Sequence, residues 1–248
     1  PYRCTYCFNR TLNERYGPYP GARFRCRDPE AVCDDILYVK RRWGVGLVWF
    51  LDANFCANVR WLERFVAVYR RRVGLPFMCK LRPERASAKV VGLLEEGGCT
   101  AVGVGIESGS ARIRRDILGR PVDDQAILQG VGRLKARGLR VLSFSMLGIP
   151  TETLDEALST VALNVACGVD FAAATILQPY PGTAIASWAV ERGHFDGDFD
   201  RLDYSYFGES PFGFGDEQKR RLANLQRLFS YAVEFPFVRR RLRWLLER

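Results

Sequence analysis

The sequence predicts an α/β fold in which parallel strands alternate with helices. Five short apolar runs are each followed by a segment in which apolar residues recur at helical spacing. Capping residues stand directly before most of these helical segments. Such alternation indicates a parallel sheet, because parallel strands must be joined by crossover connections. The length of 248 residues suits one α/β domain of barrel size or two small domains.

The expected elements follow one another from the amino terminus. A first helix is expected at 29–43, where Asp28 is the cap and Pro29 takes the first helical position. The later helices begin at capping residues or after a Pro-Gly turn, and most end near glycines; they cover 58–73, 87–97, 123–137, 153–167 and about 183–192. Strands are expected at 45–51, 76–80, 100–106, 139–146 and 170–177.

A helix at the front, with no strand before it, leads us to expect one more strand upstream. With that strand restored, the chain has six βα units. Six units form either an open barrel or a doubly wound sheet. In both architectures the chemistry lies at the carboxyl ends of the strands.

The pattern changes after residue 195, so we divide the chain into a core at 1–195 and a C-terminal part at 196–248. Residues 196–215 are rich in Asp, Gly, Phe and Tyr and are expected to form a long loop or lid. A helix is expected at 216–231, and a short amphipathic Arg/Trp/Leu helix at 235–248. We expect this last helix to pack on the core or on another domain; membrane association is the less favoured alternative.

Composition sets broad limits on function. Hydrophobic residues make up 48% and charged residues 26% of the chain, as in an ordinary globular protein. No apolar run is long enough to cross a bilayer, and no signal peptide is visible, so we expect a cytoplasmic protein with reduced cysteines. The net charge of +9 raises the alternative of a nucleic-acid partner. Nucleic acid is disfavoured because the arginines are scattered and no RNA-binding motif is present.

Two cysteines at the start of the chain carry the strongest chemical signal. Cys4 and Cys7 are separated by two residues, a spacing that is typical of redox-active pairs, of half a zinc site or of part of an iron–sulfur site. The zinc interpretation needs a second Cys or His pair. His194 is the sole histidine, and Cys26 and Cys33 are too widely spaced for the usual zinc knuckle.

The context of this pair resembles the cluster loop of radical S-adenosylmethionine (SAM) enzymes. That loop has the pattern CxxxCxxC with an aromatic residue before the last cysteine, and Cys4, Tyr6 and Cys7 match its second half. The first cysteine of the motif would fall immediately before Pro1, so we expect the chain to be a piece that begins just after it. In this family three thiolates hold a four-iron, four-sulfur cluster and SAM chelates the open iron.

Further motifs resemble the family in the expected order along the chain. Residues 51–55 resemble the turn that faces the methionyl end of SAM, which implies roles for Asp52 and Asn54, although Asp52 could equally serve as a helix-capping residue. Lys80 and Arg82 end the next strand, where a cation could pair with the SAM carboxylate or could simply be solvated at the surface.

The segment 103–110 resembles the GIESGS motif of the family, and this implies that Glu107 accepts hydrogen bonds from the SAM ribose, with Ser108 beside it. The segment 143–153 resembles LGLPGET, which implies SAM contacts for Ser145 and close backbone approach at Gly148. Within it, Glu152 is expected to cap or charge the next helix. The turn that contains Pro179 resembles PYPGT on the adenine side, or simply starts a helix.

The resemblance is closest to the subgroup that carries an N-terminal cobalamin-binding domain. It implies a partial (βα)6 TIM-like barrel lacking its first strand, with a C-terminal helical extension. It also implies an enzyme that cleaves SAM reductively, generates a 5′-deoxyadenosyl radical and, with cobalamin bound by an upstream domain, methylates an unactivated carbon. A radical cyclase or oxidative rearrangement, an RNA-modifying enzyme and a non-catalytic remnant remain as alternatives. The expected partners are a small-molecule substrate, such as a lipid or natural product, and a reductant such as flavodoxin or ferredoxin.

Overall fold

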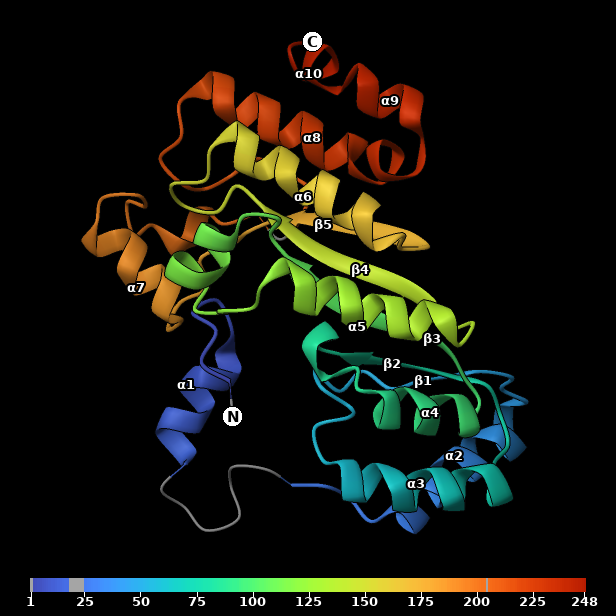
Figure 1. The fold of residues 1–248 in the computed structure, drawn as a ribbon. Coiled ribbons are helices and arrows are strands. Elements are labelled where there is room, and N and C mark those ends of the chain that lie inside the picture. The colour runs from blue at the N-terminus through green and yellow to red at the C-terminus, as the bar shows by residue number, and fades with distance from the viewer. Residues whose placement is uncertain (1, 18–24, 204) are drawn as a thin grey trace.

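The five strands form one parallel sheet whose order follows the chain (Figure 1). The computed structural model describes residues 2–17, 25–203 and 205–248. The strands are β1 (Val48–Trp49), β2 (Phe77–Leu81), β3 (Cys99–Glu107), β4 (Arg140–Leu147) and β5 (Phe171–Ile176). Each pairs in parallel with the next. A doubly wound sheet would reverse its order at a switch point, so the predicted partial barrel is confirmed.

Five helices follow the strands, as the sequence predicted: α3 (Val59–Arg72), α4 (Ala88–Glu96), α5 (Asp124–Ala136), α6 (Leu154–Cys167) and α7 (Ala184–Glu191). Their predicted starts are confirmed at Asn58, Ser87 and Asp123, each of which accepts a hydrogen bond from a first-turn amide. Such caps satisfy amides that have no partner inside the helix. Thr153 begins α6 with a complete capping box closed by Glu156. The expectation that Glu152 caps this helix is therefore wrong.

Two apolar clusters hold the helices against the sheet. The larger one packs α2 (Pro29–Trp43), α3 and α4 against β2 and β3, with Phe65, Tyr69 and Phe77 fully buried at its centre. The second packs α8 (Asp216–Glu234) across β5 and α6 through Leu222, Leu225 and other side chains. Cys79, Cys99 and Cys167 lie in or beside apolar stretches of the sequence and are buried.

The first strand is shorter and more exposed than predicted. The apolar run at 45–51 suggested a buried strand, but β1 has only two residues, and Leu47, Trp49 and Leu51 are half-exposed or more. Within the described residues β1 has a partner on one side only, β2. A strand at a sheet edge keeps one side open, so an apolar run alone does not report burial.

Helical structure departs from the prediction at both ends of the chain. No motif was seen at 8–27, yet α1 spans Phe8–Tyr16; its N-cap residue, Cys7, makes no side-chain capping bond, so the usual start signal is missing. The helix predicted at 235–248 is two short helices, α9 (Pro236–Arg240) and α10 (Leu242–Leu246), which pack against α8 through Leu242 and Leu246.

The segment 196–215 is partly built into the core. Ser210 and Phe212 are 2% and 1% exposed, so this stretch is anchored at that point rather than being an open lid throughout. Phe199–Arg201 forms a short 3-10 helix, η3. Among the described residues, no helix is long and apolar enough to cross a membrane.

Candidate functional site

The cysteine loop is fastened to the carboxyl edge of the sheet by backbone contacts. The Thr5 amide and hydroxyl donate to the carbonyls of Leu118 and Ile117, which close the π-helical turn η2 (Ile113–Ile117) after β3. The Thr5 carbonyl accepts from the Ile185 amide in α7, which follows β5. The loop with Cys4 and Cys7 is therefore held by two segments that both follow strands, where the chemistry of parallel barrels lies.

Arg82 connects the end of β2 to this loop. Its guanidinium lies 3.9 Å from the centre of the Tyr2 ring, and its Nη1 donates to Cys4 Sγ over 3.5 Å. Arg82 also pairs with Glu84. A guanidinium that donates to a cysteine sulfur holds that sulfur in place. The residue predicted to meet the SAM carboxylate is thus placed beside a predicted cluster ligand.

A buried ion-pair network continues from Arg82 to Glu107. Glu84 lies between Arg82 and Arg120, and the Arg120 Nη1 donates to Glu107 Oε1 over 2.8 Å. The side chains of Arg120 and Glu107 are only 3% and 15% exposed. The Tyr6 phenol lies beside Glu107 and Arg120 and thereby joins the cysteine loop to the end of β3. The fold therefore brings five of the predicted site residues together: Cys4, Cys7, Tyr6, Arg82 and Glu107.

Burial and charge set the ionisation of this network. Burial raises the pKa of Glu107, and the positive charge of Arg120 opposes that rise. Burial, followed by the negative charge of Glu107, raises the pKa of Tyr6 well above its usual value. Tyr6 therefore stays a neutral phenol near neutral pH, able to donate one hydrogen bond.

The backbone at Glu107 is strained in a way that aims its carboxylate. Glu107 has φ of 68°, in the left-handed region that non-glycine residues rarely adopt. The register between β3 and β4 shifts between Gly105 and Glu107. A Cβ at position 105 would lie 2.2 Å from Glu107 Oε1 and 3.0 Å from Arg120 Nη1. Only glycine leaves room for the carboxylate to fold back onto Arg120, and strain of this kind is typical of functional sites.

The other predicted residues near β1 and β2 line the same edge. Asp52 is exposed, and Lys80 is partly buried with its ammonium 5.8 Å from the Trp49 ring. Asn54 lies just before Phe55, whose amide donates to the Lys80 carbonyl. Both polar atoms of the Asn54 side chain are buried without a hydrogen-bond partner among the described residues. A buried amide of this kind is costly unless a ligand or water satisfies it.

The predicted residues on β3, β4 and their turns are mostly engaged within the protein. Ser108 is fully buried, and its hydroxyl and carbonyl accept from the Ser110 amide and the Arg114 guanidinium. The Ser145 hydroxyl accepts a hydrogen bond from the buried side-chain amide of Asn164. The Gly148 amide donates to Glu152 over 2.8 Å, and its carbonyl accepts from Ser210. Ser210 therefore packs closely against Gly148.

The turn after β5 contains a further unsatisfied group. Pro179 is buried, and beside it both side-chain atoms of Gln178 are buried without a partner among the described residues. The Nε of Arg120 is unpartnered in the same way. Three different strands are followed by these side chains, Asn54, Gln178 and Arg120. The carboxyl edge of the sheet therefore carries polar groups with which a ligand could form hydrogen bonds.

Two central residues, Arg120 and Glu84, were not among the predicted site residues. Arg120 stands in a GRPVD segment that resembles NRGHT of the family, so a signal for it was present. Glu84 follows Pro83 after β2 and has no motif of its own. Only the fold shows that it joins Arg82 to Arg120.

The residues of this site were compared with the needs of a four-iron, four-sulfur cluster and of SAM. Cys4 and Cys7 offer two thiolates, and no group of three or more His, Cys, Asp or Glu in the described part of the chain could hold a metal ion. They fit two of the three thiolate positions of a cluster site. The unsatisfied groups of Asn54, Gln178 and Arg120 suit a polar ligand such as SAM, which carries amino, carboxylate and hydroxyl groups.

Comparison with known proteins identifies the family of this chain. The sequence model of the Radical SAM superfamily matches residues 1–163. An uncharacterized methyltransferase of Pyrococcus horikoshii is 28% identical over 191 residues, which cover 77% of this chain and 40% of that protein. The chain therefore belongs to the radical SAM superfamily, whose chemistry implies a 4Fe–4S cluster and SAM.

Solved structures show the same fold. The radical SAM methyltransferase TsrM from Kitasatospora setae, with cobalamin and a [4Fe–4S] cluster bound, matches 77% of this chain and 37% of its own, with a TM-score of 0.64 and 18% identity. Coproporphyrinogen III oxidase from Escherichia coli, also a radical SAM enzyme, matches 93% of this chain and 49% of its own, with a TM-score of 0.62 and 13% identity. The chain spans less than half the length of each of these proteins.

Glu152 at the end of β4 makes stability depend on pH. Burial raises its pKa to about 8, against hydrogen bonds from the Gly148 and Ile149 amides that lower it. The folded state then holds a proton that the unfolded state releases between the ordinary glutamate pKa and about 8. We expect the free energy of unfolding to fall by a few kcal/mol across that interval and to level off above it.

Urea unfolding of the natural chain and of Glu152→Gln at pH 5, 6.5 and 8 measures this effect. Glutamine keeps an oxygen for the Gly148 amide but does not titrate. All other groups titrate in both proteins, so the difference between the two curves isolates Glu152. If the free energy of unfolding changes with pH in the same way in both proteins, Glu152 is ionised in the folded state.

Proposed function

We propose that this chain is the core of an enzyme that cleaves SAM reductively to generate a 5′-deoxyadenosyl radical, and that the whole protein uses cobalamin to methylate an unactivated carbon. The observation that supports the first part most directly is the cysteine loop, held at a strand edge beside three unsatisfied polar side chains. The chemistry that a bound 4Fe–4S cluster supplies is one electron to SAM. The protein itself binds SAM and directs the radical that forms from it.

We assign roles to the residues around that edge. Cys4 and Cys7 ligate the cluster, and Arg82 stabilises the Cys4 thiolate. Tyr6 and Arg120 hold the Glu107 carboxylate in place for the SAM ribose. For the rest of SAM, the residues proposed to contact it are Asp52, Asn54, Lys80, Ser108, Ser145, Gly148 and Pro179.

Methyl transfer is supported by the relatives. The Pyrococcus protein is named a methyltransferase, and TsrM is a methyltransferase with cobalamin bound. In the proposed protein, cobalamin is held by a domain outside these residues. The substrate is a small molecule such as a lipid or natural product, and the electron comes from flavodoxin or ferredoxin.

The full-length protein tests this proposal after anaerobic reconstitution with iron, sulfide, cobalamin, SAM and a reductant. We expect 5′-deoxyadenosine to form, and methylation to depend on added cobalamin. 5′-Deoxyadenosine without any methylated product, with or without cobalamin, would favour the alternative of a radical cyclase or oxidative rearrangement. SAM that remains intact under reduction would contradict both.

Glu107→Gln is expected to weaken SAM binding by roughly 10- to 100-fold, because charge-assisted hydrogen bonds to a carboxylate contribute about 1.5–3 kcal/mol. Equilibrium dialysis of labelled SAM against the reconstituted protein measures the loss. Glu191→Gln on the exposed end of α7 is the matched control. Unchanged affinity in Glu107→Gln would remove the ribose role from Glu107.

A further inference from the structure

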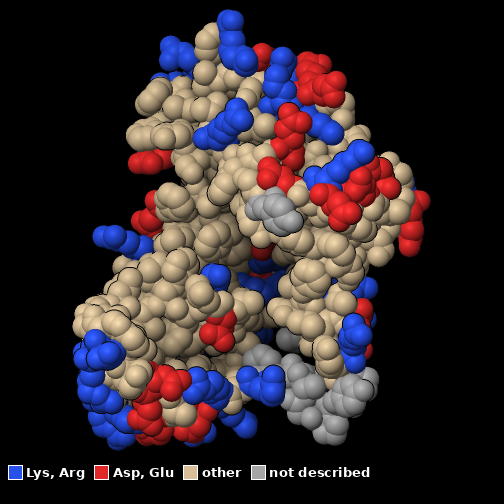
Figure 2. Space-filling model, turned by 180° about the vertical axis from the view of Figure 1, so that it is seen from behind, with Lys and Arg blue, Asp and Glu red and all other residues tan. Residues whose placement is uncertain are grey.

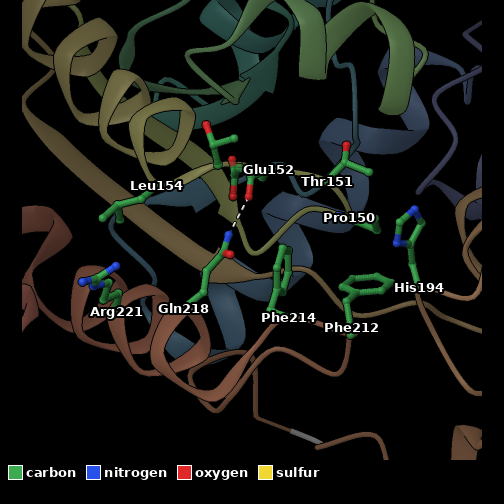
Figure 3. Close-up of a pocket in the computed structure, with 11 residues that line it drawn as sticks. Pro150, Thr151, Glu152, Leu154, His194, Phe212, Phe214, Gln218 and Arg221 are labelled. Carbon is green, nitrogen blue, oxygen red and sulfur yellow. Dashed lines mark hydrogen bonds between the residues drawn. The ribbon is translucent and has the colours of Figure 1, made fainter.

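A cavity lies where the chain leaves β4 for α6 (Figure 3). Its volume is about 370 Å³, within the range of roughly 300–1,000 Å³ that is usual for small-molecule sites. Residues 150–154, between β4 and α6, form one part of its lining. The other part is His194, Phe212, Gly213, Phe214, Gln218 and Arg221, all beyond the residues that match the superfamily.

Two residues that line this cavity each carry a buried polar atom without a partner in the described part of the chain. Glu152 is 1% exposed; its Oε2 accepts from the amides of Gly148 and Ile149, while its Oε1 has no hydrogen-bond partner among the described residues. The Nε of Arg221 is likewise buried without one. Because Oε2 already accepts two amide hydrogens, any proton on this carboxyl group lies on Oε1, where it can serve a ligand.

The remaining polar groups of the cavity are mostly occupied. The Glu152 carbonyl accepts from Gln218 Nε2 over 2.7 Å, drawn as a dashed line in Figure 3. The Thr151 carbonyl accepts from Arg112. The Nη2 of Arg221 pairs with Glu217 and with Glu247 over 2.8 Å. Since two carboxylates already balance Arg221, the cavity offers its Nε as a hydrogen-bond donor rather than an unbalanced positive charge.

The walls of the cavity combine apolar and aromatic side chains with polar ones. Figure 3 shows the rings of Phe212 and Phe214 together with Pro150 on one side of Glu152, and Leu154 with Arg221 on the other. Flat apolar walls favour a planar molecule. An anion would meet Glu217 and Glu247, the carboxylates that already balance Arg221, so the cavity suits an uncharged molecule.

We propose that this cavity binds a small, uncharged, planar molecule that carries a carboxamide or an equivalent pair of hydrogen-bond donor and acceptor. The carbonyl of such a group accepts from Arg221 Nε or from a proton on Glu152 Oε1. Its N–H donates to Oε1 when that oxygen carries no proton, and the ring packs against Phe212 and Phe214. This site adjoins the proposed SAM site through Gly148, whose amide donates to Glu152, but the proposal does not depend on SAM being bound.

Benzamide is the probe, and benzoate, which has the same shape but carries a negative charge, is its control. Isothermal titration calorimetry on residues 1–248 is expected to show benzamide binding with a dissociation constant of about 1 mM, as suits so small a ligand. Benzoate is expected to bind at least about tenfold more weakly. Equal or tighter binding of benzoate, or no benzamide binding at concentrations about tenfold higher, would overturn the proposal.

Two variants locate the binding. Leu154→Trp fills the cavity and is expected to abolish benzamide binding, whereas Leu128→Trp on α5, outside the cavity, leaves it unchanged. Arg221→Lys keeps the charge but loses the Nε hydrogen, and is expected to weaken binding about fivefold even if Leu154→Trp does not fold. Benzamide affinity that is unaltered by both cavity variants places the binding elsewhere and refutes this site.

Discussion

Residues 1–248 with one cysteine placed directly before Pro1 are expected to hold about four irons per chain after anaerobic reconstitution, whereas residues 1–248 without it hold far fewer. The added cysteine completes CxxxCxxC with Cys4 and Cys7 and supplies a third thiolate. The described residues contain no group of three metal-ligating side chains, so the two thiolates alone should not hold the cluster well. Iron and sulfide assays, with the absorption band near 400 nm, measure the difference.

Serine variants in the three-cysteine protein identify the ligands. Cys4→Ser and Cys7→Ser are each expected to lose most of the iron. Cys26→Ser is the matched control, because Cys26 is an exposed thiol near the loop in sequence and outside the motif. A full iron load on residues 1–248 without the added cysteine would show that another thiol takes the third position. In that case Cys26→Ser should remove the iron, since Cys33 is fully buried in the core.

The fold was predictable from the sequence because its signals are local. Asn58, Ser87, Asp123 and Thr153 each cap a helix through a bond to the following turn, and these bonds span only a few residues. Apolar runs located every strand as well. The run at 45–51 failed as a measure of burial because burial depends on the neighbouring strand, which a local pattern does not contain.

The candidate site was predictable where a motif carried it and not where distant segments meet. Cys4, Cys7 and Glu107 belong to sequence signatures. Three features join parts of the chain that are far apart in sequence: the contact between Arg82 and Cys4, the bridge made by Glu84, and the placement of Tyr6 beside Glu107. The hollow at the centre of the face in Figure 2, with basic and acidic side chains at its bottom, is likewise a property of the fold alone.

The role of Glu152 was also not predictable from the local sequence pattern. Its position before α6 suggested a helix cap, because acidic residues favour helix amino termini. In the structure Thr153 and Glu156 satisfy that terminus, and Glu152 turns back to the amides of Gly148 and Ile149. Two acidic residues compete for one helix start, and their spacing decides between them: Glu156 stands at the third helical position that a capping box requires.

Arg120→Met is expected to lower the free energy of unfolding by about 3–5 kcal/mol, the usual cost of removing one partner from a buried ion pair. The loss leaves both Glu107 and Glu84 without their shared cation in a largely buried setting. Urea unfolding measures it. Arg201→Met is the control, because Arg201 is 78% exposed and its pairing with Asp198 is open to solvent; little change is expected there. A small effect at Arg120 would mean that water reaches the network.

A second substitution separates the structural role of Glu107 from its proposed role toward SAM. Adding Glu107→Gln to Arg120→Met removes the buried Glu107 charge that has lost its partner. The double variant is therefore expected to recover about 1 kcal/mol or more of the lost stability. SAM binding should not recover with it, because the glutamine cannot supply the carboxylate that the ribose hydroxyls require. If stability and SAM affinity were to return together, SAM binding would need neither the Glu107 carboxylate nor Arg120, and the loss in Arg120→Met would come from the unpaired buried charge.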